Sequence, residues 1–327
     1  MEKIKIASLD LPIIRSCNLA CMGCMTHSNH KNIKGLIKPE DSTEWLKFWA
    51  DRIDVPAVTI FGGEPLLHPQ LLEWVTTVKQ VFGSKVGVNL NTNGYYLDTL
   101  FDKIPELFNE NIALSLIVSA QTQHEPYLST VKHNFDLLRT KIIEYHLSLG
   151  AKKVYWELWL DEYNINTKRW YRLIVDGKNY GIGFTMCEQY QSHWTSFYEG
   201  YADKMRPVYS YDDKWDIPNH SKCQVTNFIT LYNGRMYKCP PIGVLEHTLK
   251  TFDLLDNEQW QPFLDNIKTV GIDSTDDEII QWFDNQKDPE KLCNMCGFSG
   301  PARQEITAEQ RSHFLKENWK YIPIKAS

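Results

Sequence analysis

The segment Cys17-Asn18-Leu19-Ala20-Cys21-Met22-Gly23-Cys24 brings three cysteines together in one short stretch. It directly follows an apolar, β-branched run near residues 8–15, which predicts a strand. In a βα barrel the loops after the strands build the active-site face, so these thiols are expected where chemistry is done. Three thiolates can hold three irons of a 4Fe–4S cluster and leave the fourth iron open, whereas a structural zinc site closes with four ligands.

The first half of the chain alternates β-rich runs with amphipathic stretches, which is typical of βα units around a parallel sheet. We therefore expect an α/β protein with a partial (β/α)6 TIM-like barrel over residues 1–187. The predicted strands lie near 8–15, 57–61, 85–91, 112–119, 153–160 and 182–186, and the predicted helices near 40–53, 70–81, 97–108, 127–148 and 167–180.

Residues 188–221 interrupt this alternation and are rich in Tyr, Trp, Asp and Ser. We interpret them as a connection to a smaller unit over residues 222–327. Ligand sites commonly lie between two units, so the aromatic side chains could line a substrate pocket. They could equally be interdomain packing, because aromatic residues are as useful for burying area as for stacking on a ligand.

The composition limits the possible partners and compartment. The 327 residues carry a formal charge of −6, which provides no basic footprint for nucleic acid. No apolar run approaches the roughly 20 residues that span a bilayer, and the start Met-Glu-Lys-Ile-Lys-Ile lacks the apolar core of a secretory signal. We therefore expect a cytoplasmic protein that binds no membrane, whose eight cysteines are reduced and serve as metal ligands or catalytic groups.

A second motif, Phe61-Gly62-Gly63-Glu64-Pro65, follows the second predicted strand. Together the two motifs resemble the radical S-adenosylmethionine (SAM) superfamily, in which a C-x3-C-x2-C loop follows the first barrel strand and a GGE motif contacts the methionine amino group of SAM. Paired glycines lack Cβ atoms, so backbone carbonyls can approach that ammonium closely. The resemblance implies a 4Fe–4S cluster on Cys17, Cys21 and Cys24, and SAM contacts at Gly62, Gly63 and Glu64.

Further SAM contacts are expected at the ends of later predicted strands. The superfamily often has an aromatic residue before the third cysteine, where this chain has Gly23, so Met22 is expected to pack on the adenine instead. The alternative for the cysteine loop is a zinc site completed by His27 or His30, which the GGE motif disfavours. The other expected SAM contacts are Asn91, Asn93, Ser119, and Glu157 or Trp159.

A second group of cysteines follows residue 222. The order of Cys223, Gly234 and Cys239, followed after a gap by Cys293 and Cys296, resembles a SPASM domain without its last cysteines. This shortened α+β form is called a twitch domain, and the resemblance implies one auxiliary 4Fe–4S cluster held by the four cysteines. The Asn233-Gly234 turn predicts a hairpin that brings the first two together. A structural zinc knot is the alternative.

The resemblance implies reductive cleavage of SAM to a 5′-deoxyadenosyl radical that abstracts a substrate hydrogen. We expect a two-electron oxidation of a small polar metabolite, with the auxiliary cluster as electron acceptor and a flavodoxin or ferredoxin-like protein as donor. A peptide-modifying maturase or epimerase is the second hypothesis, with Cys187 donating a hydrogen atom, although a lone cysteine is usually a small buried hydrophobe. The third is a non-catalytic iron–sulfur or zinc protein.

Overall fold

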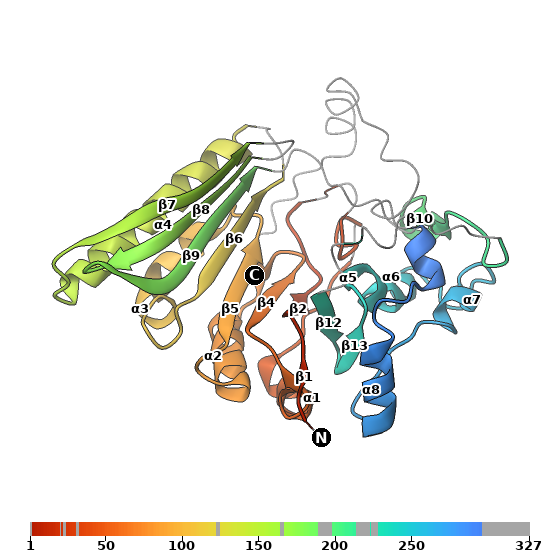
Figure 1. Ribbon diagram of the computed structural model, residues 1–327. Coiled ribbons are helices and arrows are strands. Elements are labelled where there is room, and N and C mark those ends of the chain that lie inside the picture. The colour runs from red at the N-terminus through yellow and green to blue at the C-terminus, as the bar shows by residue number, and fades with distance from the viewer. Residues whose placement is uncertain are drawn as a thin grey trace.

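The computed structural model describes residues 2–19, 21, 24–30, 33–121, 125–163, 167–188, 198–213, 223 and 228–295 (Figure 1). Within this part of the chain, nine strands form one sheet in the order β13-β12-β2-β4-β5-β6-β9-β8-β7. The run from β12 to β9 is parallel, and β13, β8 and β7 are antiparallel additions at the two edges. These strands are β2 (Ser8–Ile14), β4 (Ala57–Gly62), β5 (Gly87–Thr92), β6 (Ser115–Ala120), β7 (Val154–Tyr163), β8 (Thr167–Val175), β9 (Lys178–Glu188), β12 (Phe228–Tyr232) and β13 (Arg235–Tyr237).

The longer helices follow the strands as βα units require. They are α1 (Pro39–Ala50) before β4, α2 (Leu71–Phe82) between β4 and β5, and α4 (Tyr127–Ser148) after β6, while the 3-10 helix η2 (Leu97–Lys103) and α3 (Ile104–Leu107) connect β5 to β6. Two strand pairs lie outside the main sheet. The remaining elements are β1 (Ile4–Lys5), β3 (Ile53–Asp54), η1 (Pro65–Leu67), β10 (Tyr198–Glu199), η3 (Ala202–Lys204), β11 (Arg206–Pro207), α5 (Pro240–Gly243), α6 (Leu245–Thr251), α7 (Gln261–Leu264), α8 (Asp276–Asp284) and η6 (Lys291–Met295).

The two faces of the parallel sheet differ in polarity. One face is apolar and forms a continuous buried core with the helices, as Leu11, Ile60 and Trp74 illustrate. The other face carries a row of short polar side chains, because the strand register places neighbours from five strands side by side. That row runs Thr230, Asp10, Thr59, Asn89 and Ser115.

The predicted α/β class with a mainly parallel sheet is confirmed, and so are the first four predicted helices. The helix predicted over 167–180 is wrong, because these residues form β8 and the start of β9. Asp176 and Gly177 both adopt positive φ, as a two-residue hairpin turn requires, and the preceding run is rich in aromatic and β-branched residues. As a result the strand predicted over 153–160, here β7, lies at the sheet edge, and β9 is the parallel neighbour of β6.

The C-terminal hairpin belongs to the main sheet, since β12 pairs in parallel with β2. The predicted Asn233-Gly234 turn is confirmed, with positive φ at both residues. Beyond it, α5 to α7 pack around a smaller apolar core that includes Leu245 and Trp260. The predicted boundaries 1–187, 188–221 and 222–327 stay predictions.

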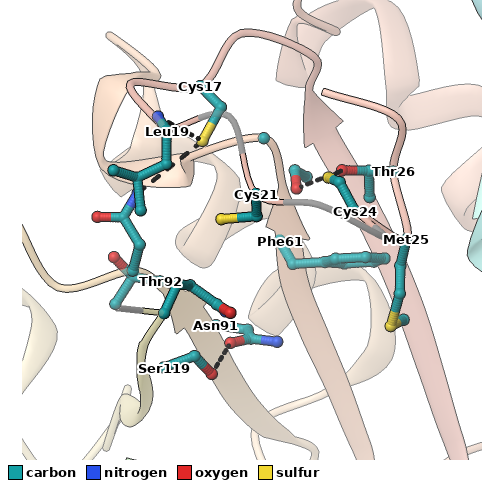
Figure 2. Close-up of a pocket in the computed structure, with 14 residues that line it drawn as sticks. Cys17, Leu19, Cys21, Cys24, Met25, Thr26, Phe61, Asn91, Thr92 and Ser119 are labelled. Atoms are coloured by element: carbon teal, nitrogen blue, oxygen red, sulfur yellow. Dashed lines mark hydrogen bonds between the residues drawn. The ribbon is translucent and has the colours of Figure 1, made fainter. Parts of the chain in front are cut away.

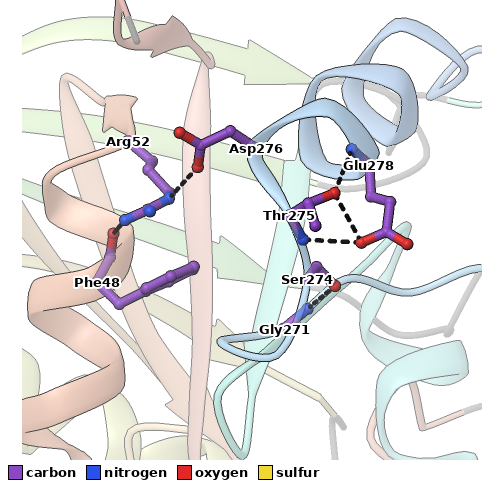
Figure 3. A network of polar contacts seen from close by, with 7 residues as sticks. All are labelled: Phe48, Arg52, Gly271, Ser274, Thr275, Asp276 and Glu278. Atoms are coloured by element: carbon purple, nitrogen blue, oxygen red, sulfur yellow. Dashed lines mark hydrogen bonds and ion pairs between the residues drawn. The ribbon is translucent and has the colours of Figure 1, made fainter.

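An ion pair ties the first turn of α8 to the segment that directly follows α1 (Figure 3). Thr275 and Glu278 form a capping box at the first turn of α8, which satisfies backbone donors that a helix start leaves free. Arg52, just after α1, donates to Asp276 over 3.1 Å. None of the helices in the described part of the chain is both long and apolar enough to cross a membrane.

Asp10 allows a test of whether burial on the polar face of the sheet raises the pKa of a carboxyl group. Burial raises the pKa of its carboxyl to about 7, so the folded protein keeps the proton that the unfolded chain loses near pH 4. The free energy of unfolding of the cluster-free protein should therefore fall as pH rises from 4 to 7. In urea titrations, Asp10→Asn should make that fall smaller by on the order of 2 kcal/mol. The expected effect is smaller than the raised pKa alone would give, because the Asp10 side chain is only partly buried. Asp54→Asn, at an exposed position, is the control, and equal slopes in both variants would contradict the assignment.

Candidate active site

The paired glycines lie directly against the loop that carries the cysteines. Gly63 N–H donates to the Ile14 carbonyl over 2.7 Å, and Glu64 N–H donates to the Ser16 carbonyl over 2.9 Å. A Cβ atom on Gly62 would lie 2.2 Å from the Ile14 oxygen, and one on Gly63 would lie 2.1 Å from the Ser16 oxygen. Both positions must therefore be glycine, because the chain's own backbone fills the space that a side chain would need.

Glu64 joins the ends of two strands from a fully buried position. Its carboxylate accepts hydrogen bonds from Leu66 N–H (2.9 Å), the Thr92 hydroxyl (2.7 Å) and Asn93 N–H (2.8 Å). Burial raises the pKa of Glu64 to about 7, although these three donors act in the opposite direction. The side chain does not line the pocket described next, so Glu64 positions the loops after β4 and β5.

A pocket of about 210 Å³ opens between these strand ends and the cysteine loop (Figure 2). Most of the residues predicted for the N-terminal cluster and SAM line it, namely Cys17, Cys21, Cys24, Gly62, Gly63, Asn91, Asn93 and Ser119. Its other lining residues were not predicted from the sequence, and they are Leu19, Met25, Thr26, Phe61, Thr92 and Gln121.

Thr26 connects the cysteine loop to the glycine pair. Its hydroxyl donates to the Gly62 carbonyl over 2.9 Å and lies 3.4 Å from the Cys24 sulfur. A hydroxyl two residues beyond the third cysteine was the available sequence signal, but residue type alone does not show that it reaches across to β4.

The amides after β5 are held from both sides. The Asn93 side chain donates to Asn18 Oδ1 over 2.7 Å, and the Tyr127 hydroxyl donates to the Asn93 carbonyl over 2.7 Å. Ser119 donates to Asn91 Oδ1 at 3.5 Å (Figure 2). Polar groups from the ends of the neighbouring strands β5 and β6 thus line the same pocket.

Comparison with known proteins identifies the region that surrounds this pocket. Residues 11–142 match the radical SAM superfamily. The chain therefore carries a radical SAM domain. It is 32% identical over 111 residues to GTP 3',8-cyclase of Aquifex aeolicus (strain VF5), covering 33% of this chain and 34% of that protein. It is 27% identical over 113 residues to the probable GTP 3',8-cyclase of Methanococcus aeolicus, covering 34% and 38%. The matches thus span about a third of these relatives' length.

Among solved structures, the chain is similar to BtrN in complex with AdoMet (SAM) and 2-DOIA. The identity is 15%, the TM-score is 0.38, and the match covers 82% of this chain and 89% of that one. It is also similar to histidine-tagged anSMEcpe with bound AdoMet, with 21% identity, a TM-score of 0.34, and coverage of 42% and 40%.

The radical SAM domain implies a 4Fe–4S cluster, and the pocket's donor set fits one. All three thiols of the motif line the same cavity, and Leu19 N–H points to the Cys17 sulfur at 3.4 Å. Burial and the neighbouring thiols raise the pKa of Cys17 and of Cys21. Bound iron would offset this penalty, because a thiol that coordinates a metal ion is deprotonated. Which residues bind the cluster and AdoMet stays a prediction.

Several predicted residues lie away from the radical SAM pocket. Glu157 is on β7 and forms an ion pair with Arg172 on β8, and Trp159 on the same edge strand is 52% exposed, so the structure brings neither to the pocket. Cys187 is buried on β9, beside Ser119 in the register, but does not line the cavity. Met22 lies outside the described residues.

The two histidines of the zinc alternative turn toward the C-terminal part of the chain. His30 uses both ring nitrogens within the protein, with Nε2 2.6 Å from the Tyr198 hydroxyl and Nδ1 accepting from Ala202 N–H at 3.1 Å. His27 Nδ1 lies 3.4 Å from the Thr248 hydroxyl. The structure thus gives His30 other partners than a metal bound at the cysteine loop.

The C-terminal cysteines are only partly described. Cys239 precedes α5, Cys293 lies in η6 and accepts from Glu290 N–H at 3.3 Å, and Cys223 is half-buried. None of the described cysteines forms a disulfide. Cys296 lies outside the described residues, so the second cluster, the twitch domain and the zinc-knot alternative stay predictions.

Gly63→Ala tests the contact between the glycine pair and the cysteine loop. The new methyl group would meet the Ser16 carbonyl at 2.1 Å, so the loop must move. We expect a loss of roughly 3 kcal/mol in unfolding free energy and a large loss of iron after anaerobic reconstitution. Gly183→Ala is the matched control, because its Cβ would lie an ordinary 3.6 Å from Ser115 Oγ. Normal iron content in Gly63→Ala would refute the steric account.

Proposed function

We propose that this protein is a radical SAM oxidoreductase that removes two electrons from a small polar metabolite. The observation that carries the proposal is a pocket in which three thiols meet the glycine pair at the polar face of a parallel sheet. When bound, the cluster and AdoMet supply a 5′-deoxyadenosyl radical that takes a hydrogen atom from the substrate. The protein's own residues hold, orient and shield the reactants.

Cofactor binding is assigned to the pocket-lining residues. Cys17, Cys21 and Cys24 would hold the cluster. Thr26 orients the Gly62 carbonyl, and that oxygen is our candidate acceptor for the AdoMet ammonium. Asn91 and Ser119, already joined to one another, would hydrogen-bond the rest of the cofactor.

The polar sheet face supports a small polar substrate. Asn91 and Phe61 line the pocket, and two residues earlier on the same strands lie Asn89 and Thr59. Two residues of a strand span about 6.6 Å, so a small metabolite can reach from the pocket to this row. The hydroxyl and amide groups there, which are half-buried, would match the hydroxyls or amines of a substrate that covers them, since polar groups taken out of water need hydrogen-bond partners.

The second electron needs an acceptor, and we assign this role to an auxiliary cluster on Cys223, Cys239, Cys293 and Cys296. Support comes from α6, which follows Cys239 and packs against the start of the cysteine loop. Thr248 of α6 accepts from Arg15 over 2.9 Å, and His247 Nε2 lies 3.2 Å from the Lys34 carbonyl. A flavodoxin or ferredoxin-like protein is the proposed electron donor.

Iron content and AdoMet cleavage test this proposal. The anaerobically reconstituted protein should hold about eight irons, and a Cys17→Ala, Cys21→Ala, Cys24→Ala triple variant about four. Only the wild type should release 5′-deoxyadenosine when reduced with dithionite. If the wild type held only about four irons and the triple variant none, the C-terminal cysteines would hold no cluster, and the proposed electron acceptor would be refuted. Absence of 5′-deoxyadenosine would refute radical SAM catalysis and favour the hypothesis of a non-catalytic iron–sulfur protein.

Epimerisation or another modification of a peptide is the second candidate function, and Cys187 is the observation that favours it. Its neighbour in the register, Ser119, lines the pocket. Burial raises the pKa of the Cys187 thiol, which keeps it in the S–H form that can donate a hydrogen atom. The burial also suits an ordinary core cysteine.

Cys187→Ala distinguishes oxidation from epimerisation. If the thiol donates hydrogen, the variant should still form 5′-deoxyadenosine while losing at least about tenfold in product, a cost of about 1.4 kcal/mol in transition-state stabilisation. If oxidation is the reaction, product formation should be unchanged within about twofold. Cys187→Ser, which keeps the size but has a stronger X–H bond, is the control for packing, and equal loss of AdoMet cleavage and product would show a structural role.

A further inference from the structure

Arg15 is a buried cation without an ion-pair partner in the described part of the chain. It is 2% exposed and precedes the first cysteine by two residues. Its Nη2 donates to the Thr248 hydroxyl over 2.9 Å, while Nε and Nη1 have no hydrogen-bond partner there. Arginine stays protonated in proteins, so its charge cannot be removed by titration.

Within the described part of the chain, the titratable side chains that act on Arg15 include no carboxylate. Burial, and secondarily the charge of Arg15, lowers the pKa of His27 and of His247, so both rings are neutral. Burial raises the pKa of Tyr232, which keeps the phenol neutral as well. A buried, unpaired guanidinium is costly, so its retention calls for an anion that completes the site.

The position of Arg15 is fixed by the same contacts that fix the cysteine loop. Its N–H donates to the Gly35 carbonyl over 2.8 Å, and its own carbonyl lies 2.8 Å from the point where a Cβ on Gly63 would stand. Arg15 also precedes Cys17 by only two residues. Its backbone is therefore held at the base of the loop that carries the three thiols.

We propose that Arg15 is the counter-charge of the N-terminal 4Fe–4S cluster and raises its reduction potential. A cluster with three thiolate ligands is anionic, and reduction adds one more negative charge. A fixed cation in a low-dielectric surrounding stabilises the reduced form more than the oxidised form. Arg15 thus acts as a positioning residue for charge and does not touch the reacting atoms.

The proposal predicts opposite effects of Arg15 in the two states of the protein. With the cluster bound, removing the charge should make the midpoint potential more negative. Without the cluster, the same charge is uncompensated, so removing it should leave the melting temperature unchanged or raise it. A side chain needed only for packing would lower the melting temperature of the cluster-free protein.

The experiment compares Arg15→Met, which removes the charge, with Arg15→Lys, which retains it. Arg52→Met is the matched control, because Arg52 is partly exposed and paired with Asp276. Midpoint potentials come from redox titrations followed by electron paramagnetic resonance, and the signal lost in the triple cysteine variant identifies the N-terminal cluster. We expect a more negative potential for Arg15→Met alone, and wild-type values for the other two.

Two results would overturn the proposal. One is a wild-type potential in an Arg15→Met protein with full iron content. The other, which needs no cluster, is a lower melting temperature of cluster-free Arg15→Met than of cluster-free wild type. Neither measurement uses a substrate, so failure of the proposed oxidation leaves this inference standing, and its own failure leaves the proposed oxidation intact.

Discussion

The site depends on the close approach of two backbone segments. One is the end of β2 with the start of the cysteine loop, and the other is Gly62-Gly63-Glu64 at the end of β4. Two hydrogen bonds of 2.7 and 2.9 Å join them, and no side chain fits at either glycine. Parallel strands end at the same edge of a sheet, so their loops are neighbours by topology. Because the glycines lack Cβ atoms, the two backbones can touch, and this contact fixes the position of the start of the cysteine loop.

The polar groups around this contact differ in how many hydrogen-bond partners the protein supplies to them. Glu64 is buried yet accepts three hydrogen bonds, and these join the ends of β4 and β5. Cys17 and Arg15 are less well compensated. The Cys17 sulfur accepts from Leu19 N–H and the Arg15 side chain donates to the Thr248 hydroxyl, and desolvation still opposes the charged form of both side chains. Glu64, whose hydrogen bonds are satisfied within the protein, therefore positions the loops of the site. The thiols and Arg15 have fewer such partners, and a bound charged cofactor would supply the missing interactions.

The alternation of strand-like and helix-like runs was sufficient to predict the α/β class. The cysteine spacing and the GGE motif predicted the three thiols and the two glycines of the pocket, because both motifs are local and both follow strands. Asn91, Asn93 and Ser119 could be placed for the same reason, as each lies near the end of a parallel strand. Glu157 failed because the prediction assumed that β7 was the fifth barrel strand. The Asp176-Gly177 turn makes β7 and β8 an antiparallel hairpin instead, and periodicity alone did not reveal it.

The residues that the sequence did not predict act across long separations. Thr26 reaches Gly62, and Arg15 reaches Thr248 on α6, and neither pairing follows from spacing. The second contact exists because β12 returns to pair with β2, which makes the first long strand of the chain an interior strand of the sheet. The cysteine loop therefore lies between the glycine pair after β4 and the helices after β13. Any change in how the C-terminal hairpin pairs would alter the surroundings of Arg15, and hence the charge next to the cysteines, without touching a residue of the motif itself.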